Sequence, residues 1–396
     1  MKGKTGIIPT VFLAMIVAAT GACAPTDTNA ETESNGSPQT TLPSAGVPRA
    51  FTMEGPVIGL AVRGNGLWTT TPAGVVRWDL EDGSHRTYTV QDGLAGNDVR
   101  EIVVDSQGNV WVTAYLSGVS RFDGRKWESF SVKNGLCSDD TISLAADNKG
   151  GVWVSAYWGV SHFDGEKWSS YSDVGPDAIV VGGPNPMKDC QDLTLVEGKL
   201  SAADEIFVDS GGDVWFSSRT GGVTRYDGKE WRSFTSKDGL GEGGITAIFE
   251  DKDGVIWLAG WTGITSFAGT TFNFYPIPSY QSVIPRPIIQ DVLQDAQGNL
   301  WVAAYGAGVV EFDGKGWTSY SVQHGLPSAN AQQLFLNHDG YPGVITDKGV
   351  SRFDGNTWRP MTAADGLPQG KVKLVIEDEN GNLWFASDKG VSCYGK

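Results

Sequence analysis

The sequence predicts an all-β fold, an eight-bladed β-propeller built from four-stranded antiparallel blades. Three observations predict it. A unit of about forty residues recurs along the chain, and one copy reads GNVWVTAYLSGVSRFDGRKW at Gly108–Trp127. Glycine is abundant, with 53 residues, and tryptophan is frequent, with 15. Short apolar runs separated by glycine-rich turns dominate the chain after residue 50, and this pattern favours strands over helices.

The first residues are typical of a targeting segment. Two lysines precede the apolar run Ile7–Ala19, which is too short to span a membrane comfortably as a permanent helix. The sequence TGAC, which ends at Cys23, resembles a bacterial lipobox, so we expect residues 1–22 to be a signal peptide and Cys23 to be lipidated. Ordinary signal cleavage after Ala24 is the alternative. Either way, the mature protein is expected outside the cytoplasm, in the periplasm or at the cell surface.

A polar linker is predicted to follow. Residues 23–48 are rich in Thr, Ser, Pro, Glu, Asn and Gly and hold almost no large apolar side chains, so they are expected to form a flexible tether. No later stretch is apolar enough to be a transmembrane helix. The N-terminal lipid is therefore the only membrane attachment that we expect.

Eight units can be counted in residues 49–396. The tryptophans that open the second strand of each unit are Trp68, Trp111, Trp153, Trp215, Trp257, Trp301 and Trp384, and Gly343 takes this place in one unit. Successive anchors are 41 to 44 residues apart, except for the 62 residues between Trp153 and Trp215. An insertion at residues 173–200 accounts for the excess, and it is either a lid over the binding face or a tolerated surface loop.

Each unit parses into strands A to D, and the chain ends supply the missing piece. The last unit stops after its strand C, whereas RAFTME at Arg49–Glu54 has the sequence of an isolated strand D. We expect this N-terminal strand to complete the eighth blade, because closure removes the exposed sheet edges of an open array. The repeated Trp and Phe residues are then expected to fill the wedges between blades.

The repeat D-x-x-G-x-x-W, followed by G-V-x-x-F-D-G-x-x-W and G-L, resembles the two-component regulator propeller repeat over nearly all of residues 50–396. In that family such propellers commonly form the extracytoplasmic sensor part of hybrid histidine kinases, and several are linked to sensing oligosaccharides. No kinase or receiver sequence follows here, so the resemblance implies a stand-alone binding propeller. Propeller lyases of the streptogramin type are a weaker resemblance, and no catalytic residue of theirs has a match in this chain.

One position per blade varies where the rest of the unit repeats. It is the residue four places after the strand-B anchor, in the loop between strands B and C, on the face that propellers commonly use for binding. The candidate ligand-binding residues at this position are Tyr115, Tyr157, Arg219, Trp261, Tyr305, Asp347 and Asp388, with Pro72 in the first blade, and Trp158 adds another ring beside Tyr157. Aromatic rings with a polar edge suit sugars, and Arg and Asp supply orienting hydrogen bonds. The alternative is that the rings simply cap the blade ends.

Three cysteines follow Cys23. Cys137 and Cys190 are predicted in loops of neighbouring blades on the same face, and outside the cytoplasm we expect them to pair. Two reduced thiols are the alternative. Cys393 lies in the last strand and is expected to be a buried thiol.

The remaining chemistry argues for binding rather than catalysis. A net charge of −16 argues against nucleic acid as a partner. The four histidines fall in different units without metal-ligand spacing, and no nucleophile elbow or phosphate loop occurs, so we expect no metal, cofactor or catalytic residue. We predict a monomeric extracytoplasmic lipoprotein that binds a glycan, a peptide or an envelope protein. The alternatives are a lyase or hydrolase that uses Asp347 and Asp388, and a pure interaction scaffold.

Overall fold

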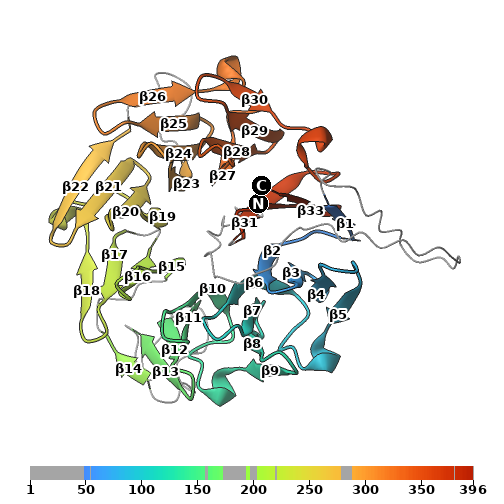
Figure 1. Ribbon diagram of the computed structural model, residues 1–396. Coiled ribbons are helices and arrows are strands. Elements are labelled where there is room, and N and C mark those ends of the chain that lie inside the picture. The colour runs from blue at the N-terminus through green and yellow to red at the C-terminus, as the bar shows by residue number, and fades with distance from the viewer. Residues whose placement is uncertain are drawn as a thin grey trace, which may run out of the picture.

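The computed structural model describes residues 49–53, 55–156, 159–172, 193–196, 203–218, 221–277, 288–378 and 380–395. Eight sheets follow one another around a ring, and strand A of each sheet lies nearest the centre (Figure 1). In seven of the eight sheets, strands A to D pair antiparallel in chain order, and in the eighth the N-terminal strand β1 takes the place of strand D. This confirms the predicted eight-bladed propeller. Among the described residues, no helix has the length and apolar character needed to cross a membrane.

The blades are named here in chain order. Blade 1 contains β2 (Gly59–Arg63), β3 (Gly66–Thr71), β4 (Gly74–Asp79) and β5 (His85–Tyr88), and blade 2 contains β6 (Val99–Val104), β7 (Val110–Ala114), β8 (Gly118–Phe122) and β9 (Trp127–Phe130). Blade 3 contains β10 (Thr141–Ala146), β11 (Val152–Ala156), β12 (Gly159–Phe163) and β13 (Trp168–Ser172), and blade 4 contains β15 (Glu205–Val208), β16 (Val214–Ser217), β17 (Val223–Tyr226) and β18 (Trp231–Phe234). Blade 5 contains β19 (Ile245–Glu250), β20 (Ile256–Gly260), β21 (Gly263–Ala268) and β22 (Thr271–Pro276), and blade 6 contains β23 (Ile288–Gln294), β24 (Leu300–Tyr305), β25 (Gly308–Phe312) and β26 (Trp317–Tyr320). Blade 7 contains β27 (Ala331–Leu336), β28 (Pro342–Thr346), β29 (Gly349–Phe353) and β30 (Trp358–Pro360), and blade 8 contains β31 (Val372–Glu377), β32 (Leu383–Ser387), β33 (Gly390–Tyr394) and β1 (Arg49–Thr52).

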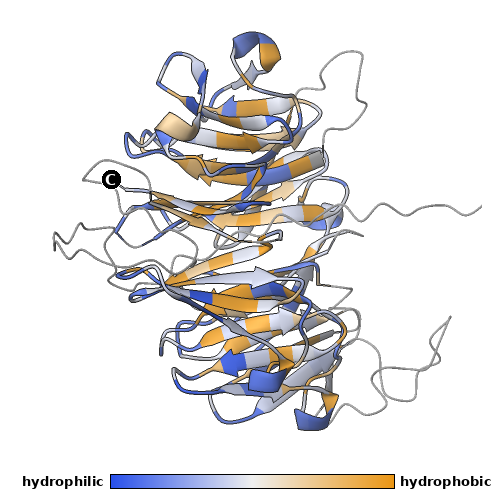
Figure 2. Ribbon diagram, turned by 90° about the vertical axis from the view of Figure 1, so that its right-hand side faces the viewer, coloured by the Kyte–Doolittle hydropathy of each residue, from blue (hydrophilic) through white to orange (hydrophobic). Residues whose placement is uncertain are grey.

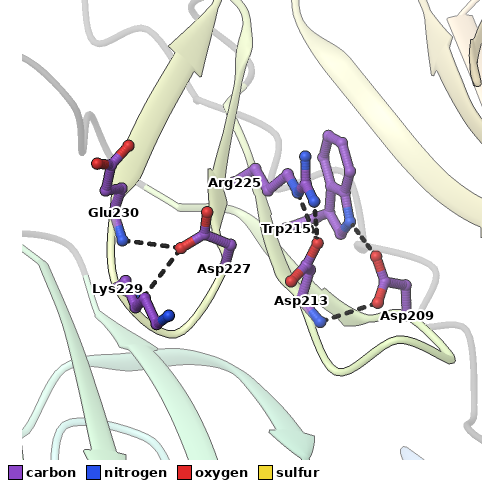
Figure 3. Close-up of polar contacts among 7 residues, drawn as sticks. All are labelled: Asp209, Asp213, Trp215, Arg225, Asp227, Lys229 and Glu230. Carbon is purple, nitrogen blue, oxygen red and sulfur yellow. Dashed lines mark hydrogen bonds and ion pairs between the residues drawn. The ribbon is translucent and has the colours of Figure 1, made fainter. Parts of the chain in front are cut away.

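A buried aspartate joins the turn between strands A and B to the tryptophan of strand B, and we call this contact the Asp–Trp clasp. In blade 4, the carboxylate of Asp209 accepts the amide N–H of Asp213 at 2.8 Å and the indole N–H of Trp215 at 2.9 Å (Figure 3). Gly212, between them, has a φ of 87°, a conformation that glycine adopts without strain. The D-x-x-G-x-x-W spacing therefore follows from the geometry of this one turn between strands A and B.

The same clasp recurs in four other blades. The pairs are Asp105–Trp111 at 2.8 Å, Asp251–Trp257 at 2.8 Å, Asp295–Trp301 at 2.8 Å and Asp378–Trp384 at 2.9 Å. In each pair the aspartate also accepts backbone N–H groups of the turn, so one side chain satisfies donors from the backbone and from the core at once.

Three blades replace part of the clasp. Blade 1 has no aspartate in this turn, and the indole N–H of Trp68 is buried without a hydrogen-bond partner among the described residues. In blade 3 the carboxylate of Asp147 bonds His162 Nε2 at 2.9 Å, and that imidazole stacks on Trp153 with ring centroids 4.2 Å apart. In blade 7 the ring of Phe335 lies where a side chain at Gly343 would stand, which explains why the blade carries glycine in place of tryptophan.

The clasped tryptophans fill the wedges between blades, as expected. Trp111 stacks on Phe130 of its own blade, at 5.7 Å between centroids, and contacts Phe163 and Trp168 of the next blade at 5.3 Å and 6.1 Å. Figure 2 shows the hydrophobic residues along the strands and many hydrophilic residues in the turns at their ends. Burial of these rings between sheets therefore holds the ring of blades together.

The Asp-Gly turn between strands C and D is held by its aspartate, as blade 4 shows in the sequence Tyr226-Asp227-Gly228. Asp227 accepts the backbone N–H groups of Lys229 at 3.0 Å and Glu230 at 2.8 Å (Figure 3). Only the glycine of the pair, Gly228, has a positive φ, of 86°. The aspartate thus stabilises the turn as a hydrogen-bond acceptor, and the glycine supplies the left-handed conformation.

The N-terminal strand closes the ring. Strand β1 pairs antiparallel with β33, with Phe51 opposite Val391, so the first and last segments of the propeller share blade 8. Phe51 is 2% exposed, and its ring lies 5.3 Å from Trp78 of blade 1 and 6.2 Å from Trp384 of blade 8. The predicted closure by the N-terminal strand is confirmed.

The described part of the insertion lies at the rim of blade 3. Strand β14 (Leu193–Leu195) pairs in parallel with β13, the outermost strand of the blade, and Val196 N–H donates to the Ser172 carbonyl at 2.8 Å. Residues 173–192 and 197–200 lie outside the described residues, so a lid on the loop face stays a prediction.

The cysteines differ from expectation. Cys137 is a buried thiol whose backbone amide donates to Ser161 Oγ at 3.0 Å, which does not support its pairing with Cys190. Cys190 and Cys23 lie outside the described residues. Cys393 is buried, but it takes part in a disulfide, so the expectation of a thiol there is wrong.

Ring closure predicts a stability effect at Phe51. We expect Phe51→Ala to lower the free energy of unfolding by about 3–5 kcal/mol, because it leaves a cavity between blades 1 and 8. Guanidinium unfolding followed by tryptophan fluorescence measures the loss. Val322→Ala, at a side chain that is 57% exposed, is the control and should change stability by less than about 0.5 kcal/mol. Equal losses in the two variants would mean that the N-terminal strand does not close the ring.

Candidate functional site

The loops between strands B and C and the loops that lead from strand D to the next strand A meet at one end of the propeller. Tyr115 N–H in a B–C turn donates to the Asp98 carbonyl in a D–A loop at 2.8 Å, and Gly308 N–H donates to the Ala329 carbonyl at 2.8 Å. We call this end the loop face. The opposite end carries the A–B and C–D turns with their aspartates.

Three predicted aromatic residues are exposed on the loop face. Tyr115 is 51% exposed, Trp261 is 38% exposed and Tyr305 is 45% exposed, whereas most tryptophans of the described chain are buried between blades. Trp261 and Tyr305 belong to the neighbouring blades 5 and 6, and Tyr115 belongs to blade 2. Tyr157, Trp158 and Arg219 lie outside the described residues, so their part in the site stays a prediction. Pro72, in blade 1, is exposed in its turn.

Local backbone contacts hold these rings in place. The Trp261 side chain lies against Gly243, where a Cβ atom would come within 3.2 Å of the indole, and Gly243 has a φ of 101°. Tyr305 forms a β-bridge with Asn330 of the next blade. Each ring is thus fixed to the D–A loop beside it, which lowers the entropy lost when a ligand binds.

Blade 2 adds two residues that the sequence did not single out. The guanidinium of Arg100 lies 5.0 Å from the centre of the Tyr115 ring and pairs with Asp98 at 2.8 Å. Leu116, next to Tyr115, is 56% exposed and has a φ of 52°, the only positive φ of a non-glycine residue in the described chain. The left-handed conformation costs an L-residue about 1–2 kcal/mol. An exposed leucine held in this state is unusual, and strain of this kind gathers at functional sites.

The two carboxylates of blades 7 and 8 are held by their own loops. Asp347 Oδ2 accepts from Asn330 Nδ2 at 3.0 Å, and hydrogen bonds from Ser328 and Asn330 hold the pKa of Asp347 below its ordinary value. Asp388 Oδ1 accepts the backbone N–H of Lys371 at 2.8 Å. Each of these side chains therefore takes part in the hydrogen bonding of its own loop.

Sequence reasoning missed the lysines beside these aspartates. Lys348 and Lys389 follow them in the turns Thr-Asp-Lys-Gly and Ser-Asp-Lys-Gly, and both side chains are exposed. The repeated Asp-Lys-Gly triplet was the signal that could have found them. The described arc is therefore bordered by lysine ammonium groups as well as by carboxylates.

The innermost strands carry buried polar side chains that join neighbouring blades. Asp291 Oδ2 accepts Leu334 N–H of the next blade at 2.8 Å, and Gln333 Oε1 accepts Val375 N–H at 2.9 Å. Burial raises the pKa of Asp291 to about 7. Burial also raises the pKa of Glu101, at the equivalent place in blade 2, well above its ordinary value. These groups lie inside the wall of the propeller, and we assign them to blade-to-blade contact.

Within the described part of the chain, no group of three or more His, Cys, Asp or Glu side chains is arranged to hold a metal ion. Some Asp-rich turns resemble calcium loops in sequence, but they are turns between strands A and B. In one of them, the carboxylate of Asp251 accepts hydrogen bonds from the Trp257 indole N–H and from two backbone N–H groups.

Comparison with known families agrees with this geometry. The model of the two-component regulator propeller family matches residues 239–262 and 366–389. Each matched segment runs from the Gly-Leu pair of a D–A loop through the A–B turn to the B–C turn. These two segments of the chain are therefore similar to the two-component regulator propeller repeat. No curated protein matches the chain in sequence.

Solved structures share its fold at low sequence identity. The computationally designed protein Ika8 is 13% identical, with a TM-score of 0.61 over 87% of this chain and 98% of that protein. Virginiamycin B lyase from Staphylococcus aureus is 15% identical, with a TM-score of 0.50 over 74% of this chain and 93% of the lyase. The extracellular domain of the putative hybrid two-component system BT4673 from B. thetaiotaomicron is 16% identical, with a TM-score of 0.40, and the match covers 91% of this chain but 62% of that domain.

Asp291 is expected to make the free energy of unfolding depend on pH, and the shift of its pKa fixes the direction of that dependence. Its pKa rises from 3.8 in the unfolded chain to about 7 in the folded protein, so between these values the folded state binds a proton that the unfolded state lacks. This contribution to stability is full below the unfolded pKa and is lost as the pH rises through about 7. We therefore expect the free energy of unfolding to fall between about pH 5 and about pH 8, and Asp291→Asn to flatten that fall.

Guanidinium titrations across this pH range measure the effect, and Asp339→Asn, at an exposed position, is the control. A remaining slope in Asp291→Asn is assigned to Glu101, whose pKa is raised by the same cause. A pH profile that Asp291→Asn leaves unchanged would show that this carboxyl titrates alike in the folded and unfolded states.

Proposed function

We propose that this regulator propeller is an extracytoplasmic binding protein, held to the membrane by a lipid on Cys23, that takes an oligosaccharide on its loop face without transforming it. The sequence of residues 1–22 supports export, and the propeller repeats of the sensor family support a binding role. The polar linker at residues 23–48 would let the propeller reach away from the membrane surface.

The observation that carries the proposal is the exposure of Tyr115, Trp261 and Tyr305 at equivalent turn positions on one face. Flat rings with a polar edge stack on the apolar face of a pyranose and still offer a hydrogen bond at their rim. Three rings on separate blades would contact separate sugar units, which favours an oligosaccharide over a single sugar.

Binding rather than catalysis is supported by the state of the carboxylates. A general acid needs a raised pKa and a path to the reacting atom. Asp347 has a lowered pKa instead, and it is hydrogen-bonded to Asn330 within its own blade. Asp388 is likewise bonded to the backbone of Lys371. We assign both carboxylates to turn structure.

A protein partner is the second candidate. Leu116 favours it, because an exposed leucine in a strained conformation beside Tyr115 and Arg100 is typical of a contact that inserts into another protein surface. An envelope protein or a peptide would then occupy the blade 2 side of the loop face.

A glycan array combined with thermal-shift assays on residues 46–396 tests the primary proposal. We expect at least one oligosaccharide to bind and stabilise the protein, and Tyr115→Ala and Trp261→Ala each to weaken binding by about tenfold, or roughly 1.4 kcal/mol. Phe274→Ala is the matched control, since this ring is 37% exposed at the outer strand of the same blade as Trp261. Equal weakening by all three variants, or no binding to a broad panel by folded protein, would contradict a glycan site on the loop face.

A further inference from the structure

Three lysines gather on the loop face of blades 7 and 8. Lys348 and Lys389 lie at the tips of the B–C turns of these neighbouring blades, and Lys371 lies in the D–A loop between the two blades, directly before β31. All three side chains are exposed. We call them the lysine group.

The backbone of the lysine group is fixed. Lys348 N–H donates to Thr346 Oγ1 at 3.2 Å, and Lys389 N–H donates to Ser387 Oγ at 3.0 Å. The same hydroxyls donate to the carbonyls of Gly349 and Gly390 at 2.8 Å and 3.1 Å. Each hydroxyl therefore bonds both a backbone N–H and a backbone carbonyl of its turn. The side chains of Lys348 and Lys389 thus extend from equivalent backbone positions that are held by the same hydrogen bonds.

Lys371 joins the two turns. Its backbone N–H donates to Asp388 Oδ1 at 2.8 Å in its own blade. The charges of Lys348 and Lys371 both favour the charged form of Asp347 in blade 7. A Cβ atom at Gly370 would lie 2.7 Å from the Lys389 side chain, so the loop of Lys371 and the turn of Lys389 are in contact.

The ammonium groups remain available to a ligand. In the part of the chain that the structure describes, no ion pair joins any of the three lysines to a carboxylate. The nearby Asp347 and Asp388 already accept hydrogen bonds from Asn330 and from the Lys371 backbone. Each ammonium group carries three donors and no acceptor, so the complementary ligand is an anion.

The negative charge of the whole protein makes the lysine group unusual. The chain has a net charge of −16, and such a protein repels anions in general. Three exposed lysines without an ion pair among the described residues, on the same face as the exposed Tyr305 and Trp261, therefore favour an anionic ligand at this place in an acidic protein. Blade 6, which carries Tyr305, is the neighbour of blade 7, so rings and ammonium groups follow each other around the face.

We propose that the lysine group binds the anionic substituents of a carbohydrate, so that the ligand of the loop face is an acidic oligosaccharide. The inference rests on the function proposed above and adds the chemical class of the ligand. The rings of Trp261 and Tyr305 would stack on sugar units, and Lys348, Lys371 and Lys389 would donate to carboxylate or sulfate groups on the units that follow.

Calorimetric titration with four probes tests the proposal on residues 46–396. The probes are a hexagalacturonide, a neutral galactohexaose, a sulfated galactan hexasaccharide and a hexaglutamate peptide. The variant combines Lys348→Gln, Lys371→Gln and Lys389→Gln. The control combines Lys126→Gln, Lys229→Gln and Lys315→Gln, which removes the same charge from exposed C–D turns at the opposite end.

We expect the wild type to bind an acidic sugar at least tenfold more tightly than the neutral one, with an affinity that falls as salt is added. The lysine variant should lose that preference, while the control variant keeps it. Binding of the hexagalacturonide supports a carboxylate ligand, and binding of the sulfated sugar alone supports a sulfate ester.

Four results would overturn the proposal. Equal losses in the two triple variants would show a net-charge effect without a site. Preferential binding of the neutral sugar would remove the acidic class and leave the proposed glycan function standing, whereas no binding to any sugar would remove both. Binding of hexaglutamate through the lysines, without any sugar, would assign the face to an acidic protein.

Discussion

The Asp–Trp clasp is the interaction on which this propeller depends. A carboxylate buried in the A–B turn accepts the indole N–H of strand B together with backbone N–H groups of its own turn, as Asp295 does with Trp301 and Asn299 at 2.8 Å each. The indole must lie in the wedge between blades, where its polar N–H would cost about 1–3 kcal/mol if left without an acceptor. The clasp removes that cost and fixes the turn and the wedge with one side chain. It is present in five of the eight blades, and in those blades it supports the packing of one blade on the next.

A frame built in this way separates structure from binding. The clasps and the Asp-Gly hairpins occupy one end of the blades, so the other end is free to vary without disturbing the wedges. Hydroxyls such as Thr346 Oγ1 and Ser387 Oγ close the B–C turns there and fix the backbone from which Tyr, Trp, Asp and Lys side chains extend. The loop face thus combines rigid positions with variable chemistry, which is what recognition requires.

The parts of the fold that could be predicted are those that every blade must repeat. The D-x-x-G-x-x-W spacing located the blades, the short last unit and RAFTME predicted closure through β1, and Gly343 was recognised by alignment. The orientation of loop side chains could not be predicted in the same way. Asp347 and Asp388 looked like an acidic arc, but they bond to their own loops, because a carboxylate in a turn competes for nearby N–H groups. The φ of Leu116 and the disulfide at Cys393 depend on neighbours that sequence spacing does not reveal.

A double-mutant cycle between Asp295 and Trp301 measures the clasp most directly. The free energy of unfolding is determined for wild type, Asp295→Ala, Trp301→Phe and the double variant, so that the cavity left by the smaller ring cancels in the cycle. The account predicts a coupling energy of about 1–3 kcal/mol, because removal of the indole N–H makes loss of its acceptor less costly. If the losses in the free energy of unfolding of the two single variants add to that of the double variant within about 0.5 kcal/mol, the account is contradicted. The buried carboxylate would then stabilise the turn without stabilising the tryptophan between the blades.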